Sequence, residues 1–396
     1  MDRVTGWSEP DESPKAASTD DFGQTADLRR RLETIDWPPI LLAIVALVLL
    51  VWLGRDMTFY HDDWALILKR DLSINGILAP HNEHLIATLV VLYRVLIATV
   101  GIGSYWPYLG VTFALHLAVA GLVYVIVKRE ASAGWALGAM AVMLVLGSGG
   151  DDILWAFQSA SVGVVAAGIG AIVVAPRRPG VAAALLTIAM ATSGASLAFF
   201  VGTGVRLLLT RPRAVLWLVV PAGLYLAWYV TFGHSGIAAL RSPSLQGVPD
   251  YMAIGLSAAA AGALGSTNLL VGVVACVAIT VAVVQFWPVP PIVLALLAAG
   301  AAFFFIAGTV RAELGPEQAA ASRYVYIVAP AFIAAGAVLL SRLPKAIGPL
   351  IGAVVLAVAL VLNLGLLFQA HDRLVSKIAC ERPMTPIARG SAGNPC

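Results

Sequence analysis

Charged side chains are scarce in this chain. Asp, Glu, Lys and Arg together make up 12% of its 396 residues, whereas hydrophobic residues make up 60%. An average soluble domain is about 25% charged, so the composition argues against a soluble globular protein. The formal net charge is only +3 and is scattered over short loops, which gives no reason to expect a nucleic acid as partner.

Several motifs of familiar enzyme sites are missing as well. The sequence has no glycine-rich Walker loop, and the loops expected to face the cytoplasm contain no DxD-like acidic cluster. A nucleotide-driven cytoplasmic reaction is therefore not expected. Neither a GxSxG nor an HExxH motif is present. Cysteines are few, and Cys276 falls inside an apolar run, where a small buried thiol is expected.

Long apolar runs are what the sequence has in abundance, and its mean hydropathy is +0.88. About 20 apolar residues in a helix cross roughly 30 Å of hydrocarbon. An all-α polytopic membrane protein is therefore expected. The runs lie at residues 38–54, 85–102, 107–127, 133–147, 153–175, 180–194, 196–210, 214–232, 256–284, 290–309, 324–341 and 347–369.

Basic residues between these runs predict which of them cross, because cytoplasmic loops carry an excess of Lys and Arg. If the run at 85–102 crossed, Lys128, Arg129 and several later basic pairs would lie outside. If it lies along the outer surface or re-enters the membrane, all of these pairs become cytoplasmic. Arg94 within the run supports this, since a mid-bilayer charge costs about 2.5–3.5 kcal/mol or more; a spanning helix with a snorkelling Arg94 is the alternative. We expect about eleven transmembrane helices and an extracytoplasmic juxtamembrane helix in the first outer loop.

We expect the protein in the plasma membrane, and the expected topology divides the chain into three parts. Residues 1–36 are acidic and polar, which predicts a disordered tail, and the arginines at 29–31 favour the cytoplasm for it. Residues 37–371 form the expected transmembrane domain, with 55–106 as the first extracytoplasmic loop. Residues 372–396 form an expected extracytoplasmic tail. Thiols oxidise on that side, so we predict a disulfide between Cys380 and Cys396, with two unpaired thiols as the alternative.

The first outer loop contains an acidic pair, Asp62 and Asp63, in the motif FYHDDW at 59–64. Asp62 as a helix cap and the aromatic residues as an interfacial belt are one interpretation. Ionisable groups held at membrane level are usually functional, however, so the pair and the nearby Tyr60 are candidate site residues. Adjacent carboxylates repel each other, so one is expected to have a raised pKa. Successive helical residues point about 100° apart, so one is expected to face the site, and we favour Asp62.

The same loop continues with the motif PHNEH at 80–84. His81 and His84 stand one helical turn apart with Glu83 between them, a spacing that can hold a divalent metal. No third histidine follows at a fixed spacing, and interfacial histidines also occur without a metal. A divalent metal is thus the one candidate cofactor.

Later loops on the expected outer side add further polar residues. Asp151 and Asp152 either cap the following helix or contact a substrate. They are followed by Trp155 and by Gln158, whose amide lies in an apolar helix and needs a partner.

Two arginines, Arg311 and Arg323, bracket another loop of the expected outer side, and Tyr324 follows. They are either interfacial anchors or ligands of a phosphate group, which a planar guanidinium suits. The positive-inside rule makes arginines less expected on this side, so a phosphate at the membrane surface would explain both.

Together these motifs resemble the GT-C superfamily, the polytopic glycosyltransferases that use polyprenyl-phosphate-linked sugars, including protein O-mannosyltransferases and lipid A aminoarabinose transferases. The resemblance covers most of residues 38–370 and is carried by 59–64, 80–84, 155–158 and the Ser-Arg-Tyr at 322–324. Two departures are visible. The acidic pair is Asp-Asp where mannosyltransferases have Asp-Glu, and the Pro-His at 80–81 reverses the His-Pro order of the family.

This resemblance implies an inverting glycosyltransferase at the extracytoplasmic face. Asp62 or Asp63 would be the general base. A polyprenyl-phosphate-linked sugar would be the donor and a cell-envelope glycan, lipid or protein the acceptor. The implied donor-phosphate residues are Arg311, Arg323, His81 and His84, and the implied substrate contacts are Tyr60, Glu83, Asp151, Asp152, Trp155, Gln158 and Tyr324.

Two other functions fit the same topology. A transporter or flippase of a lipid-linked sugar should carry ionisable residues near mid-membrane or paired repeats, of which the sequence shows few and none, respectively. A non-catalytic subunit of a cell-envelope complex would not need acidic residues clustered in one loop.

Overall fold

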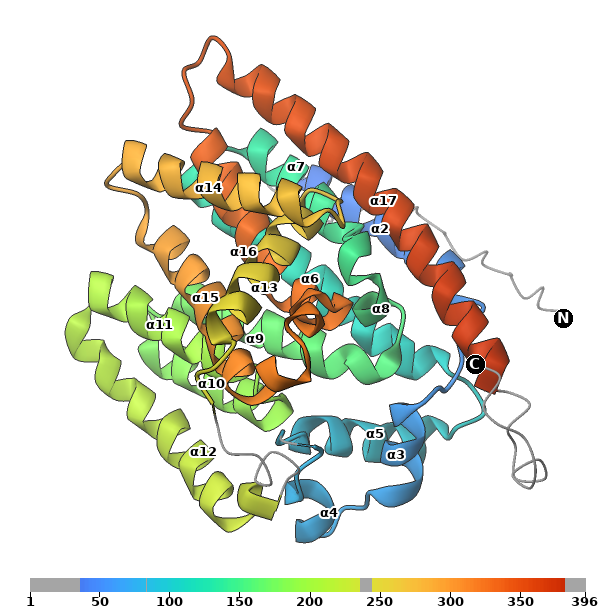
Figure 1. The fold of residues 1–396 in the computed structure, drawn as a ribbon. Helices are drawn as coiled ribbons and strands as arrows, with labels where there is room; N and C mark the ends of the chain where they lie inside the picture. The colour runs from blue at the N-terminus through green and yellow to red at the C-terminus, as the bar shows by residue number, and fades with distance from the viewer. Residues whose placement is uncertain (1–35, 83, 236–243, 382–396) are drawn as a thin grey trace, which may run out of the picture.

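The computed structural model describes residues 36–82, 84–235 and 244–381. Most of the predicted N-terminal tail and Cys396 lie outside these residues, so the tail and the Cys380–Cys396 disulfide stay predictions. Within the described ranges the regular secondary structure is helical, apart from one isolated backbone bridge between His81 and His84. Figure 1 shows a bundle of helices with α3, α4 and α5 gathered at one end.

Eight helical segments of the described chain are long and apolar enough to cross a membrane. This agrees with the expected all-α membrane protein. They are α2 (Trp37–Gly54), α6 (Trp106–Glu130), Ala133–Ile153 (containing α7, Ala133–Leu144, and α8, Gly150–Ile153), Ala156–Val174 (containing α9, Ser159–Val174), Pro212–Thr231 (containing α12, Val219–Thr231), Pro291–Leu314 (containing α15, Pro291–Arg311), α16 (Ser322–Leu340) and α17 (Gly348–Glu381).

Four further apolar helices are shorter: α5 (Ala87–Val100), α10 (Pro179–Thr192), α11 (Ser196–Thr210) and α14 (Leu269–Gln285). α5 corresponds to the run at 85–102. At about 1.5 Å per residue its 14 residues span about 21 Å, which is less than the roughly 30 Å of a hydrocarbon core. Arg94 on this helix donates to the backbone oxygens of Leu66 and Ile67, both at 2.7 Å. Its charge therefore binds the last turn of α3 (Asp62–Lys69), where a cation is favoured.

The apolar run at 256–284 was predicted as one span, and this prediction was wrong. The structure divides the region into α13 (Val248–Ala263) and α14. Gly265 adopts a φ of +75° at the break, a conformation that side chains with a Cβ rarely adopt. The two helices then pack closely, because a Cβ at Gly272 would lie 1.8 Å from the Ser257 oxygen. The sequence does mark this turn, because Gly-Ser-Thr-Asn at 265–268 interrupts the apolar residues.

The last helix, α17, has 34 residues and continues to Glu381, beyond the predicted start of the C-terminal tail at 372. At about 1.5 Å per residue it is about 51 Å long, so part of it must extend past the hydrocarbon. Figure 1 shows this helix running along one edge of the bundle. Its polar end contacts loop 55–106, since His371 Nε2 lies 3.3 Å from Asp56 Oδ2 and Glu381 accepts from the His61 amide.

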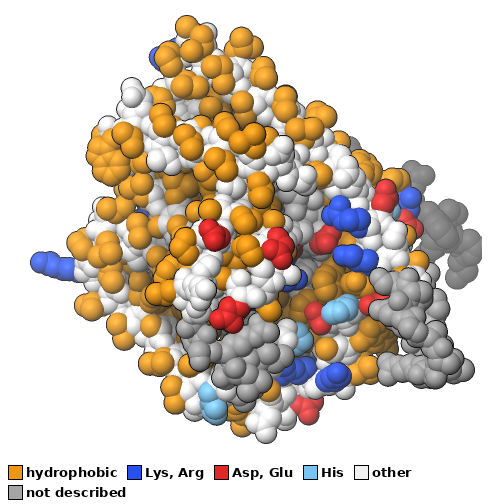
Figure 2. All heavy atoms as spheres, in the orientation of Figure 1, with side chains coloured by type: hydrophobic (Ala, Val, Ile, Leu, Met, Phe, Trp, Pro, Cys, Tyr) orange, Lys and Arg blue, Asp and Glu red, His pale blue; other side chains and the backbone are white. Residues whose placement is uncertain are grey.

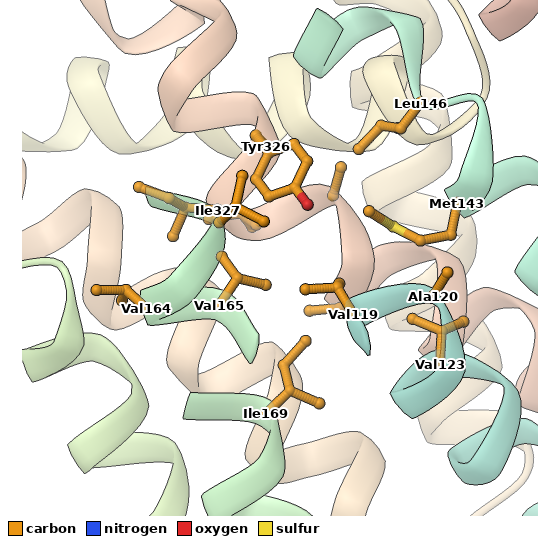
Figure 3. Packing of buried hydrophobic residues seen from close by; sticks show 14 of the residues in the cluster. Val119, Ala120, Val123, Met143, Leu146, Val164, Val165, Ile169, Tyr326 and Ile327 are labelled. Carbon is orange, nitrogen blue, oxygen red and sulfur yellow. The ribbon is translucent and has the colours of Figure 1, made fainter. Parts of the chain in front are cut away.

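The core surrounds α16, the most buried of the eight long segments. Figure 3 shows Tyr326 and Ile327 of this helix among side chains of α6, α7 and α9. Figure 2 shows a largely hydrophobic upper surface, with most charged side chains lower down and to the right, towards the end that holds α3 and α4. A lipid environment explains the exposed apolar surface. The charged end, which contains loop 55–106, holds the predicted site residues of that loop.

Candidate active site

One cavity of about 780 Å³ lies where loop 55–106 meets the ends of several helices. Its walls come from this loop, the segment before α9, the turn between α10 and α11, α12, α15 and the start of α16. The predicted site residues that line it are Tyr60, Asp62, His81, His84, Trp155, Gln158, Arg311, Arg323 and Tyr324. Segments far apart in the sequence therefore contribute to one site.

Asp62 is the acidic residue that faces this cavity. It begins α3, and its side chain is 31% exposed. Asp62 Oδ1 lies 3.3 Å from His61 Nδ1 and 3.9 Å from His81 Nε2. Burial lowers the pKa of His81, which favours a neutral imidazole ring near the carboxylate. An accessible carboxylate of this kind can take a proton from a hydroxyl group.

Asp63 points the other way and is completely buried. Asp63 Oδ2 accepts hydrogen bonds from the Tyr60 amide at 3.0 Å, the Trp155 indole at 3.0 Å and the Tyr105 hydroxyl at 3.3 Å. Tyr93 donates to Oδ1. Burial raises the pKa of Asp63 to about 6 even though these donors lower it. Asp63 therefore ties α3 to α5, to the start of α6 and to the segment before α9, rather than reaching the cavity.

His81 and His84 belong to a tight turn, in which each backbone N–H donates to the other residue's oxygen, at 2.9 and 3.0 Å. Asn82 has a φ of +54°, which asparagine tolerates in such turns. Burial, with smaller contributions from His81 and Arg323, lowers the pKa of His84 to about 4. Its ring fits against Gly194 of the α10–α11 turn, where a Cβ would lie 2.7 Å from His84 Nδ1.

Two of the predicted metal ligands, His81 and His84, share one turn, and the third lies outside the described residues. No group of three or more His, Cys, Asp and Glu residues there is placed to hold a metal ion. Glu83, the third predicted ligand, lies outside the described residues. A metal at this turn therefore remains a prediction.

Two of the four predicted phosphate ligands, Arg311 and Arg323, form a basic wall of the cavity beside Tyr324. Arg311 donates to the Tyr324 hydroxyl. The guanidinium carbons of Arg311 and Arg323 lie 5.6 and 5.0 Å from the centre of the Tyr324 ring. Among the described residues, Arg323 has no carboxylate within ion-pair distance. Two guanidinium groups held over one ring and open to a cavity suit a phosphate group.

Other predicted residues lie elsewhere or have structural partners. Asp151 pairs with Arg373 at 3.3 Å and with Lys377 at 3.8 Å, both on α17. Asp152 is completely buried, and neither carboxyl oxygen has a hydrogen-bond partner in the described chain. Gln158 does line the cavity, and its amide oxygen accepts from the Ser161 hydroxyl at 2.8 Å.

Several aromatic residues that line the cavity were not among the predicted site residues. Tyr225 and Tyr229 on α12 line the cavity, as do Phe157 and Phe303. A spacing of four places Tyr225 and Tyr229 on one helix face, and that spacing was the available signal. Phe157 lies within the motif at 155–158 that carries the resemblance, although it was not among the predicted site residues.

No protein-family model, curated protein or solved structure matches this chain. The resemblance to GT-C glycosyltransferases thus rests on the sequence motifs alone. The function of this protein has to be inferred from the geometry of the cavity.

Proposed function

We propose that this protein is an inverting glycosyltransferase of the GT-C type, which moves a sugar from a polyprenyl phosphate to an acceptor hydroxyl. One observation carries the proposal. A single cavity brings an accessible carboxylate, Asp62, together with two guanidinium groups, Arg311 and Arg323, from the far end of the sequence. A base and an anion clamp are the two parts that this reaction requires.

The reaction assigns one role to Asp62 and another to the two arginines. The acceptor oxygen attacks the anomeric carbon and loses its proton to Asp62, while the bond from that carbon to the phosphate oxygen breaks. Attack from the face opposite the phosphate inverts the configuration. Negative charge grows on the departing phosphate, where preorganised donors such as Arg311 and Arg323 give the largest stabilisation.

Side chains next to the basic wall suit a lipid donor. Phe303, Ile306, Ala307 and Val310 of α15 line the cavity close in sequence to Arg311. A polyprenyl chain that moves from the bilayer to such side chains stays in an apolar environment, so its transfer costs little. An activated lipid also supplies the driving force on a membrane face where no nucleotide is at hand.

A transporter of a lipid-linked sugar is the second candidate, because two ionisable side chains are completely buried within the long helical segments. These are His116 on α6 and Asp152 on α8. His116 is satisfied by the Tyr326 hydroxyl at 2.9 Å and the Leu144 oxygen at 3.2 Å. A carrier would move labelled lipid-linked sugar across proteoliposomes without forming a new glycosidic bond, which separates the two functions.

The basic wall can be tested by lipid binding. Arg311→Ala and Arg323→Ala should each weaken binding of decaprenyl phosphate about 10- to 100-fold, because a hydrogen bond to a charged group contributes about 1.5–3 kcal/mol. Arg323→Lys should lie between Arg323→Ala and the unaltered protein, since it keeps the charge but loses the planar fork. Native mass spectrometry of the full chain in nanodiscs measures this binding.

Two controls accompany that titration. Decaprenol, which lacks the phosphate, should bind all variants equally. Arg373→Ala removes an arginine that pairs with Asp151 outside the cavity, and it should leave binding unchanged. If Arg311→Ala and Arg323→Ala both bind decaprenyl phosphate as tightly as the unaltered protein does, the two arginines only anchor the protein at the interface.

We also propose that the cavity opens on the extracytoplasmic side of the plasma membrane. In a chain whose three native cysteines are replaced by alanine, a cysteine at the exposed Glu317 should react with an impermeant maleimide added to intact cells. A cysteine at the exposed Arg178 should react only after the cells are opened. The reverse pattern of labelling would place the cavity in the cytoplasm.

A further inference from the structure

Two aromatic residues, Tyr60 and His61, come directly before the base Asp62, and the His61 ring lies beside its carboxylate. Trp155 and Tyr60 have ring centres 5.3 Å apart, and Trp155 and His61 have ring centres 6.1 Å apart. Phe157 continues this wall, with its ring centre 5.4 Å from that of Trp155 and an angle of 32° between the ring planes. We call Tyr60, His61, Trp155 and Phe157 the aromatic wall; all four line the cavity.

This wall is on the acceptor side of the proposed reaction. The phosphate of the donor belongs to Arg311 and Arg323, whereas the acceptor hydroxyl must come within hydrogen-bond distance of Asp62. Because His61 of the aromatic wall lies beside Asp62, we assign this wall to the acceptor molecule. Their chemistry reports what kind of molecule carries the attacking hydroxyl.

Trp155 is held rigidly in this wall. Its indole N–H donates to the buried Asp63 at 3.0 Å. The next residue, Ala156, donates its amide to the Tyr105 hydroxyl at 2.8 Å, and Tyr105 also donates to Asp63. The polar edge of the indole is thus satisfied by the protein, and the half-buried ring is left as a fixed apolar surface on the cavity. A surface fixed before binding loses little entropy when a ligand arrives.

A sugar ring matches this arrangement. One face of a pyranose or furanose presents C–H groups, which are attracted to the negative face of an aromatic ring, and its edge presents hydroxyl groups. Beside the wall, Asp62, His81 and Asn82 also line the cavity and offer donors and acceptors for those hydroxyls. An acyl chain would instead require aliphatic side chains around the base.

We propose that the acceptor is a saccharide, whose ring stacks on Trp155 with one hydroxyl directed at Asp62. This inference rests on the proposed glycosyl transfer for its assignment of sides. It names the chemical class of the acceptor and makes Trp155 a residue that determines acceptor specificity.

Saturation-transfer difference NMR on the full chain in nanodiscs tests the proposal without a donor. The probes are methyl hexopyranosides and methyl pentofuranosides, with N-acetylserine amide and glycerol as hydroxyl compounds that lack a sugar ring. At least one glycoside should receive saturation at its ring C–H protons, and the two comparison compounds should not. Trp155→Ala should weaken binding of that glycoside about tenfold, since losing a stacked aromatic surface costs about 1.4 kcal/mol.

Trp217→Ala is the matched control, because Trp217 is 50% exposed on the segment before α12 and is not part of the cavity lining. It should bind the glycoside like the unaltered protein. Equal binding by Trp155→Ala, with its melting temperature preserved, would overturn the proposal, as would saturation of N-acetylserine amide in place of every glycoside. Decaprenyl phosphate binding is measured on the same samples. If decaprenyl phosphate binds and no glycoside does, the proposed saccharide acceptor is contradicted and the proposed donor site is not. If a glycoside binds and decaprenyl phosphate does not, the proposed donor site is contradicted and the saccharide acceptor is not.

Discussion

Asp62→Asn is expected to lower the rate of sugar transfer about 10²- to 10⁴-fold, the range that a positioned general base contributes. Asparagine keeps the shape of the side chain but cannot take the acceptor's proton at neutral pH. Binding of decaprenyl phosphate should be unchanged, because the phosphate belongs to Arg311 and Arg323. A large loss in kcat with an unchanged lipid affinity would separate the base from the anion clamp.

The measurement is transfer of radiolabelled sugar from the lipid donor to an envelope extract, with the purified variant in nanodiscs. Asp71→Asn is the matched control, since Asp71 lies in the same loop but is exposed and accepts from Ser73 rather than lining the cavity. It should transfer at the normal rate. Full activity of Asp62→Asn would exclude Asp62 as the base.

Asp63→Ala is expected to lower the free energy of unfolding by about 3–5 kcal/mol, since every buried donor left without a partner costs about 1–3 kcal/mol. Tyr93, Tyr105 and Trp155 would all lose their acceptor. Asp63→Asn should cost less. Its amide oxygen can accept the donors now on Oδ2, and its NH₂ group can donate to the Tyr93 hydroxyl once that hydroxyl rotates.

Thermal unfolding in detergent, followed by tryptophan fluorescence, compares these variants with Asp71→Ala, which should stay within about 0.5 kcal/mol of the unaltered protein. The pH dependence gives a second signature. The pKa of Asp63 is raised from 3.8 to about 6 in the folded protein, so the folded state binds this proton more tightly than the unfolded state. This contribution to stability is fully present below pH 3.8 and is lost as the pH rises through about 6. Asp63→Asn should lack it, and an identical pH profile would contradict a buried, titrating Asp63.

The membrane character of the chain could be read from its composition and its long apolar runs, because both are local properties. The same holds for the residue types of the site. The motifs at 59–64 and 80–84, together with Arg311 and Arg323, were identified from charges and aromatics expected at the membrane surface. The structure places residues of all these segments around one cavity. The 100° between successive helical residues also anticipated that Asp62 and Asp63 would face different ways.

Local patterns could not supply the pairing between distant segments. The turn at Gly265 could have been found from the Gly-Ser-Thr-Asn at 265–268, but its packing against α17 could not. Asp151 was predicted either to cap a helix or to contact a substrate, and only the structure shows that α17 brings Arg373 and Lys377 beside it. The buried Asp63 accepts a hydrogen bond from Trp155, 92 positions away. Hydrophobicity and helical period depend on residues that are neighbours in the sequence. The partner of a buried carboxylate depends on how separate helices pack, and only the folded chain brings those helices together.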